Sequence, residues 1–244
     1  MKNIKKSTEP NSLAKYRNSI EIDYSKDSKI ARRIFDDNPD KNTLKTFLLK
    51  EQGYICCYCM QRIEDNHHTK IEHVKPISKY QSEILNYNNL FVACNGVTKA
   101  NTNNIQEGRK TTQIRHCDTS KGVCEQQWVE KKNINCDLTI NPTDCERCII
   151  EYKSDGTIRY HENVKKDIEE ILNLNNNILK RNRKETLKTF IQEFNKNSKA
   201  TTWSLAEIQK MLEKYQTKDE KGKYKPYCQA IISYLKKRKN RVKS

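Results

Sequence analysis

The sequence predicts an α+β fold, because short β-prone runs in the middle of the chain lie between two stretches with helical spacing. The middle part, residues 54–160, also contains all but one of the ten cysteines. We therefore expect an N-terminal arm with helices over residues 1–53, a cysteine-rich core over 54–160 and a helical region with a basic tail over 161–244. The hydrophobic fraction of 34% is below the roughly 45–50% of ordinary globular chains, so the core should be modest.

The N-terminal part divides at residue 27. Residues 1–27 are polar and show no sustained helical period, so we expect an extended arm with a turn near Pro10. Apolar residues with helical spacing follow, break before Pro39, and resume after Thr43, which is a candidate N-cap. Gly53 is expected to end that second helix before the cysteines begin.

The pattern of the central part predicts short strands separated by turns. The β-prone runs span residues 60–63, 70–74 and 90–94. A polar stretch between Cys94 and Cys117 has no apolar period and is expected to be an inserted surface loop. The segments CIIEY and TIRY then flank KSDG, whose Asp-Gly pair is typical of a tight hairpin turn.

The C-terminal part has the spacing of helices. The apolar side chains within residues 164–172 have the spacing of one helical face, and those within residues 187–194 have the spacing of another. Ser204 and Glu207 fit a capping box at the start of a third helix, and a last helix should begin near Pro226.

The charge of the chain favours an anionic partner. Its 47 Lys and Arg against 31 Asp and Glu give a net charge of +16, whose field attracts nucleic acid, although ribosomal or anionic-lipid contact would have the same signature. Six of these charges lie in the final nine residues and are expected either to bind nucleic acid or to form a solvated helix end: Lys236, Lys237, Arg238, Lys239, Arg241 and Lys243.

No run approaches the roughly 18 apolar residues of a membrane helix, and no apolar segment of signal-peptide type follows the first residues. We expect a cytoplasmic protein. In a reducing compartment, the cysteines should be metal ligands or buried thiols rather than a disulfide framework.

Four of the cysteines have the character of zinc ligands. Cys56 and Cys59 form a C-x-x-C knuckle, which turns tightly enough to direct both sulfurs at one ion. Cys94 and Cys117 would complete a structural zinc site if the ends of the insertion between them stay close. Cys57 is the alternative to Cys56, and unrelated buried thiols are the alternative to the site as a whole.

Other cysteines leave a second site open. Cys145 and Cys148 also have knuckle spacing and could pair with Cys124 and Cys136, although Cys148 opens an apolar run and is as well explained by burial. Cys228 lies on a helical face and should be a core thiol.

Glu72 and His73 lie in the second β-prone run. Metal-assisted hydrolysis of a phosphodiester needs a base to activate water and an oxygen-ligated cation to stabilise the phosphate charge. A histidine suits the first task because its pKa lies near neutrality. Taken alone, a Glu-His pair is more often an ordinary surface or packing feature.

The order of motifs resembles that of HNH nucleases, which have a zinc-pinned ββα-metal core. In that family an acidic residue or His precedes the base His, an Asn precedes an apolar strand, and a cysteine motif ends near Lys-Gly. This chain has Glu72-His73, Asn89-Leu90, Cys94 and HCDTSKG in the same order.

The resemblance implies a role for each of these residues. His73 would be the general base, Asn89 would fix its imidazole, and Glu72 with Asp118 would ligate catalytic Mg²⁺ or Mn²⁺. Glu72 stands where Asp is commoner, and Asp118 where Asn or His is usual, but both keep oxygen donors. Asn95 is the alternative to Asp118.

Over nearly its whole length the chain resembles the PtuB-like HNH nucleases of Septu-type and retron-linked antiphage systems. The segments that carry this resemblance are KKSTEPNSLAKYR, CCYC, KIEHVKP, YNNL, HCDTSKG, NPTDCERCIIEYKSDGTI and LNLNNNILKRNR. The resemblance implies a complex with a PtuA-like ABC-type ATPase. In a retron-linked system a reverse transcriptase and its multicopy DNA would join it.

The leading hypothesis is therefore a nuclease, with DNA or an RNA such as tRNA as substrate. The alternative is a non-catalytic zinc module that binds nucleic acid or a partner protein, for which charge and cysteines suffice. A restriction-type or homing HNH enzyme acting alone is a third possibility, but it should carry its own DNA-reading motif, and we find none.

Overall fold

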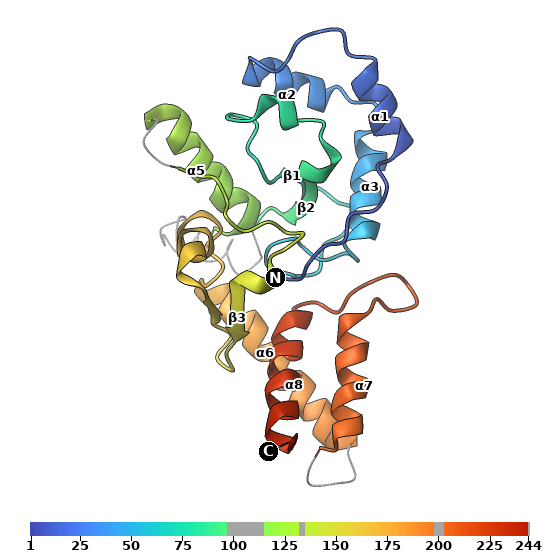
Figure 1. Cartoon of the computed structure of the whole chain (residues 1–244), viewed down its shortest axis with the longest axis vertical. Helices are drawn as coiled ribbons and strands as arrows, with labels where there is room; N and C mark the ends of the chain where they lie inside the picture. Colours follow the sequence, from blue (N-terminus) through green and yellow to red (C-terminus); the bar gives the residue numbers. More distant parts are fainter. Residues whose placement is uncertain (97–114, 132–134, 198–202, 244) are drawn as a thin grey trace.

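The computed structural model describes residues 1–96, 115–131, 135–197 and 203–243. The predicted insertion loop between Cys94 and Cys117 lies mostly outside the described residues. The remaining chain mixes helices with two small antiparallel sheets, which confirms the α+β class (Figure 1). None of the helices in the described ranges is long and apolar enough to span a membrane.

Residues 1–53 form three helices, α1 (Asn11–Asn18), α2 (Ser28–Asp36) and α3 (Lys41–Glu51). The prediction of an extended arm with a turn near Pro10 was wrong for residues 11–18, because Pro10 takes the N-cap position of α1 and Leu13 anchors that helix in the core. Helix α3 begins before the predicted cap Thr43, with Asp40 at its N-cap position.

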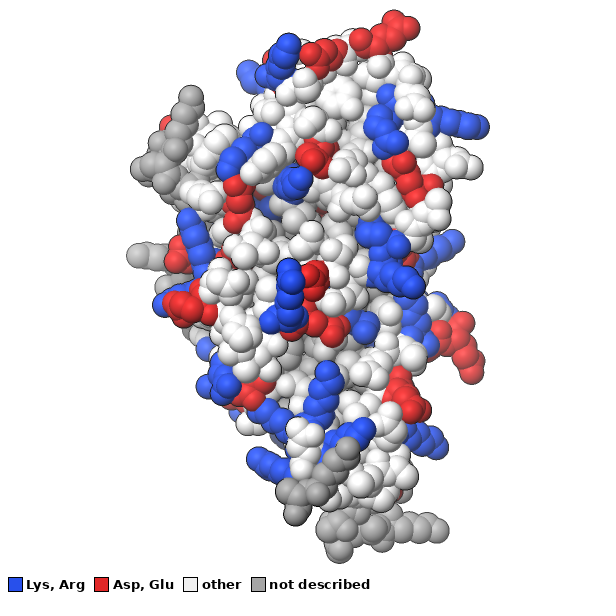
Figure 2. Space-filling model, viewed as in Figure 1, with Lys and Arg blue, Asp and Glu red and all other residues white. Residues whose placement is uncertain are grey.

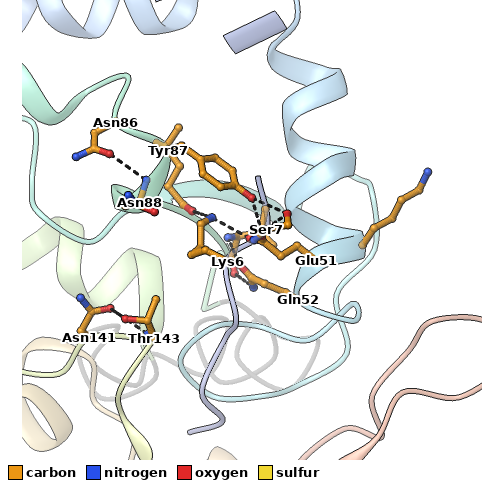
Figure 3. Close-up of polar contacts among 12 residues, drawn as sticks. Lys6, Ser7, Glu51, Gln52, Asn86, Tyr87, Asn88, Asn141 and Thr143 are labelled. Atoms are coloured by element: carbon orange, nitrogen blue, oxygen red, sulfur yellow. Dashed lines mark hydrogen bonds and ion pairs between the residues drawn. The ribbon is translucent and has the colours of Figure 1, made fainter. Parts of the chain in front are cut away.

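The first residues of the chain pack on the body of the protein. Met1 and Ile4 are buried, and Lys6 Nζ lies 2.8 Å from a carboxylate oxygen of Glu51, at the end of α3 (Figure 3). Ser7 Oγ donates to the same carboxylate at 2.7 Å, and the Tyr87 hydroxyl donates to it as well. Burial raises the pKa of Glu51, but these hydrogen bonds outweigh burial and the net pKa is lowered.

The central sheet consists of β1 (Thr69–His73) and β2 (Leu90–Cys94), which confirms two of the three predicted strands. The strands are antiparallel, and their register places Thr69 opposite Cys94 and His73 opposite Leu90. The third run, residues 60–63, contributes only an isolated bridge to residue 55. Helix α5 (Cys117–Lys131) packs against β2, so two strands and one helix lie together (Figure 1).

The second sheet confirms the predicted hairpin. Strand β3 (Ile149–Tyr152) pairs with β4 (Ile158–Tyr160) through the KSDG turn. Gly156 in that turn has a φ of +86°, a conformation that L side chains rarely adopt.

The C-terminal part is helical, with one difference from the prediction. Residues 164–172 form a 3₁₀ turn (Glu162–Val164) and a π-helical turn (Asp167–Ile171) instead of a regular helix. The long helices are α6 (Asn177–Asn197), α7 (Leu205–Gln216) and α8 (Cys228–Lys243). The capping box at the start of α7 is confirmed in both of its hydrogen bonds.

Positive charge is spread over the molecule rather than confined to the tail. Figure 2 shows Lys and Arg side chains along the whole length of the face in view, with Asp and Glu among them. The C-terminal end of α8 lies at the opposite end of the protein from α2 and β1 (Figure 1).

Candidate metal centre and adjoining pocket

Cys56, Cys59, Cys94 and Cys117 form one buried cluster. Their four sulfur atoms all lie within 4.8 Å of one another. Cys56 Sγ is 3.9 Å from Cys117 Sγ, and Cys59 Sγ is 3.7 Å from Cys94 Sγ. Zinc–sulfur bonds of ~2.3 Å at tetrahedral angles imply sulfur–sulfur distances of about 3.8 Å. The four cysteines could therefore hold a structural zinc ion with little rearrangement.

Two local conformations assemble this cluster. Met60 follows the Cys56–Cys59 knuckle with a φ of +64°, and its N–H donates to the Cys56 carbonyl at 3.1 Å. Gly96, where the insertion leaves β2, has a φ of +69°. A Cβ atom there would lie 1.9 Å from the carbonyl oxygen of His116, where the insertion returns. The two ends of the insertion are thus in contact, as a site divided by a long loop requires.

The surroundings of the Cys56 sulfur favour its ionised thiolate form. Burial opposes ionisation of Cys56, but hydrogen bonds from Cys117, Cys57 and Cys59 outweigh it and hold the pKa of Cys56 well below its ordinary value. The backbone N–H of Cys94 also donates to Cys56 Sγ at 3.4 Å. Such N–H donors are typical partners of metal-bound thiolates.

The neighbouring cysteines settle the alternatives that the sequence left open. Cys57 is buried but does not belong to the cluster, so the ligand set contains Cys56. Cys124 and Cys136 form a disulfide, contrary to the expectation of free thiols, and therefore do not complete a second zinc knuckle. Cys124 lies on helix α5 and Cys136 follows that helix in the chain, and the spacing of the cysteines does not reveal that the two are close. Cys228 is a buried core thiol, as predicted.

A small pocket lies beside the cluster, between the end of β1, helix α2 and helix α5. It has a volume of about 90 Å³. Its lining contains three of the predicted site residues and three further charged side chains: Glu72, His73 and Asp118, with Arg32, Lys121 and Glu125. Neighbouring strand residues normally face opposite sides, but β1 ends at His73, so Glu72 and His73 both line the pocket.

His73 is held in one orientation by its surroundings. Its Nε2 lies 3.0 Å from the carbonyl oxygen of Ile84, and the ring of Phe35 packs edge-on at 4.6 Å between centroids. A carbonyl oxygen only accepts hydrogen bonds, so Nε2 carries the proton of the neutral ring and Nδ1 carries the lone pair. Burial lowers the pKa of His73 to about 4, which keeps the ring neutral at physiological pH.

Asn89 does not hydrogen-bond the His73 imidazole in the structure. Its amide nitrogen donates to the carbonyl oxygens of Lys75 and Glu83 at 3.1 and 3.2 Å, and its side-chain oxygen accepts from the Lys75 N–H at 2.7 Å. These bonds tie together the loop between β1 and β2, which also carries the Ile84 carbonyl. Asn89 therefore contacts the loop that carries the Ile84 carbonyl, and not the His73 ring itself.

The carboxylates of the pocket repel one another. Burial, and next the adjacent Glu72 carboxylate, raise the pKa of Asp118 to about 7. Lys121 compensates part of this charge: its Nζ lies 2.9 Å from Glu72 and 2.6 Å from Glu125, and it donates to the His73 carbonyl at 2.7 Å. The side chains of Lys121 and Glu72 are only 4% and 5% exposed.

The pocket contains oxygen donors of the kind that bind hard cations, but among the described residues only the four cysteines bring their ligand atoms close enough together to hold a metal ion. Glu72, Asp118 and Glu125 contribute three carboxyl groups to the pocket. Lys121 and Arg32 contribute two positive charges. Carboxylate oxygens are the donors that Mg²⁺ and Mn²⁺ prefer. Asn95, the alternative to Asp118, lies outside the pocket lining, and its side chain contacts His68 Nδ1 at 3.1 Å.

The predicted basic tail lies on α8, away from this pocket. Lys237 pairs with Glu151, Arg238 lies 4.7 Å over the Trp203 ring, and Lys239 donates to a side chain of α7 at 2.7 Å. At least three of the six charges of the tail therefore have partners within the part of the protein that the structure describes.

Sequence reasoning did not single out Arg32, Lys121 or Glu125. A signal was present for two of them, because Asp118, Lys121 and Glu125 follow the i, i+3, i+7 spacing that shares one helical face. Arg32 comes from a helix distant in sequence and carried no such signal.

The sequence matches no protein-family model, and no curated protein shows significant similarity to it. We therefore base the proposed function on the geometry of the cysteine cluster and of the pocket beside it.

Proposed function

We propose that this chain is a metal-dependent nuclease of the HNH type, which hydrolyses phosphodiester bonds in the pocket beside the cysteine cluster. One observation carries the proposal: His73, with its lone pair on Nδ1, lines the same pocket as Glu72 and Asp118. The β1–β2–α5 arrangement, with four cysteines at its base, agrees with the ββα-metal core that the sequence resemblance implies.

The residues have complementary tasks in this proposal. His73 accepts a proton from water at Nδ1, while the Ile84 carbonyl holds Nε2–H in place. A base with a pKa near 4 is weak, but an anionic phosphodiester beside the ring favours the imidazolium and raises that pKa. Glu72 and Asp118 would hold Mg²⁺ or Mn²⁺, which when bound neutralises charge on the phosphate oxygens. Zinc in the cysteine cluster would have a structural role only.

The direct test is cleavage of plasmid DNA and of bulk tRNA by the purified protein with Mg²⁺. We expect His73→Ala to lower the rate by a factor of roughly 100 or more, because the base is lost. His161→Ala is the matched control, since His161 is exposed and lies outside the pocket. Equal cleavage by the two variants would remove His73 from the mechanism.

We further propose that the nuclease is the effector of an antiphage complex, held by a PtuA-like ABC-type ATPase and, in a retron-linked system, by a reverse transcriptase with its multicopy DNA. The support is the sequence resemblance of segments along the chain, together with a net charge of +16, which suits a nucleic-acid substrate. Co-purification with a PtuA-like ATPase tests the partner. Cleavage assays with and without that ATPase test its control of the nuclease.

A non-catalytic zinc module is the second candidate, and one observation favours it. Lys121 already provides Glu72 and Glu125 with a buried positive charge, so these carboxylates have a stabilising partner without a metal. Under this alternative the protein binds nucleic acid in a salt-dependent manner but cleaves neither DNA nor RNA with Mg²⁺ or Mn²⁺.

A further inference from the structure

Arg32 is a charged residue of the pocket that lies at its edge. It lines the pocket with His73 and Glu125, yet it is exposed to solvent, which places it at the rim. It makes no hydrogen bond or ion pair with any residue in the described part of the chain. Its neighbour Lys121, by contrast, is buried and paired twice.

Helix α2 fixes the position of Arg32. Asp27 caps the helix by accepting the N–H of Lys29 at 2.7 Å, and Ile34 and Phe35 bury its apolar side. Phe35 is the residue whose ring packs edge-on against His73. Arg32 lies three residues before Phe35, so both occupy adjacent turns of one helical side. The contact that orients His73 therefore also sets Arg32 beside it.

An exposed guanidinium at the mouth of a pocket is suited to an anionic ligand. Arginine presents donors in a planar fork that matches two oxygens of a phosphate group. Arg32 lines this pocket together with His73, so a phosphate group bound by the guanidinium would lie beside the imidazole.

We propose that Arg32 binds a phosphate oxygen of the substrate backbone next to His73, and so positions the scissile phosphodiester. This inference rests on the proposed nuclease function, and adds to it a catalytic residue from outside the two strands and α5. The phosphodiester group is common to DNA and RNA, so Arg32 should act on whichever of them is the substrate.

The first arm of the test measures binding without added divalent cation, with a short labelled DNA duplex and with labelled tRNA. Arg33→Ala is the matched control, because Arg33 is the next residue of α2, equally charged and exposed, but outside the pocket lining. Each lost phosphate contact lowers the slope of log affinity against log salt by ~0.9 on duplex DNA. We expect that loss for Arg32→Ala only, on the nucleic acid that is the substrate.

The second arm measures cleavage with Mg²⁺. We expect Arg32→Ala to lower kcat/KM on the order of 100-fold and Arg32→Lys to recover part of the loss, because lysine keeps the charge but not the fork. Thermal unfolding should change little in both variants, since Arg32 makes no hydrogen bond or ion pair with the residues that the structure describes.

The two arms separate the inference from the proposed function. If the wild-type protein cleaves and Arg32→Ala lowers cleavage no more than Arg33→Ala does, the role of Arg32 is overturned and the nuclease proposal remains intact. If the wild-type protein binds nucleic acid in a manner that depends on Arg32 but cleaves neither DNA nor RNA, the nuclease proposal is overturned. Arg32 would then be a phosphate-binding residue only. Absence of both binding and cleavage would overturn both.

Discussion

Replacing Lys121 with methionine tests how strongly the pocket depends on its buried ammonium. Lys121 Nζ contacts Glu72 at 2.9 Å and Glu125 at 2.6 Å, with 4% of its side chain exposed. Removing one member of a buried ion pair costs about 3–5 kcal/mol, because the remaining charge stays buried. We expect the lower value here, since the Tyr58 hydroxyl still donates to Glu72 at 2.8 Å. At this chain length, the lower value corresponds to a fall in Tm of roughly 6–12 °C. Methionine keeps most of the side-chain volume, so a cavity contributes little to the effect.

Thermal unfolding in metal-free buffer measures this effect, and Lys165→Met is the control. Lys165 pairs with Glu162 on the surface, where both side chains are mostly exposed, and such pairs contribute little. Mg²⁺ should raise the Tm of Lys121→Met more than that of the wild type, since a divalent cation replaces the lost charge beside the carboxylates. If Lys121→Met unfolded at the same temperature as Lys165→Met, the argument for a charge-dependent pocket would be refuted.

Three further tests concern the cysteine cluster, the contact between Gly96 and His116 at the two ends of the insertion, and the N-terminal arm. Cys59→Ser should abolish binding of close to one equivalent of zinc, whereas Cys148→Ser should retain it; elemental analysis decides. Gly96→Val should unfold at lower temperature, because its φ of +69° and its 1.9 Å approach exclude a side chain, whereas Gly122→Ala, with open space around it, should raise Tm slightly. The pKa of Glu51 in the folded protein lies below its ordinary value of 4.5. Ionised Glu51 therefore stabilises the folded state fully above pH 4.5, and this stabilisation is lost as the pH falls through the pKa of the folded protein. Glu51→Gln should therefore flatten the acid limb of a Tm–pH curve; an unchanged curve would exclude Glu51.

The parts that the sequence predicted correctly are those encoded locally. The β1 and β2 runs consist of β-prone residues, the Asp-Gly pair marks the hairpin, and Ser204 with Glu207 satisfies a capping box within four residues. The pairing of Cys56 and Cys59 with two distant cysteines also followed from chemistry, because zinc needs four such ligands.

The parts that it missed depend on tertiary contacts. Helix α5 has few apolar residues and no continuous apolar stripe, so its sequence did not indicate a helix, and its packing on β2 decides the outcome. The Cys124–Cys136 disulfide joins that helix to the segment after it, and an expectation based on the cellular compartment could not reveal it. Arg32 reaches the pocket only because Phe35 packs on His73.

The cysteine cluster and the pocket are linked through the β1–β2 sheet and helix α5, so a structural zinc ion would also support the site of the proposed nuclease. Cys94 ends β2, whose register with β1 sets the positions of Glu72 and His73. Cys117 begins α5, and Asp118 is the next residue. Four ligands on one ion would fix the end of the strand against the start of the helix, and thereby fix Asp118 against Glu72. Loss of zinc should consequently lower stability and activity together, whereas changes in the pocket that leave the cluster intact, such as His73→Ala, should lower activity alone.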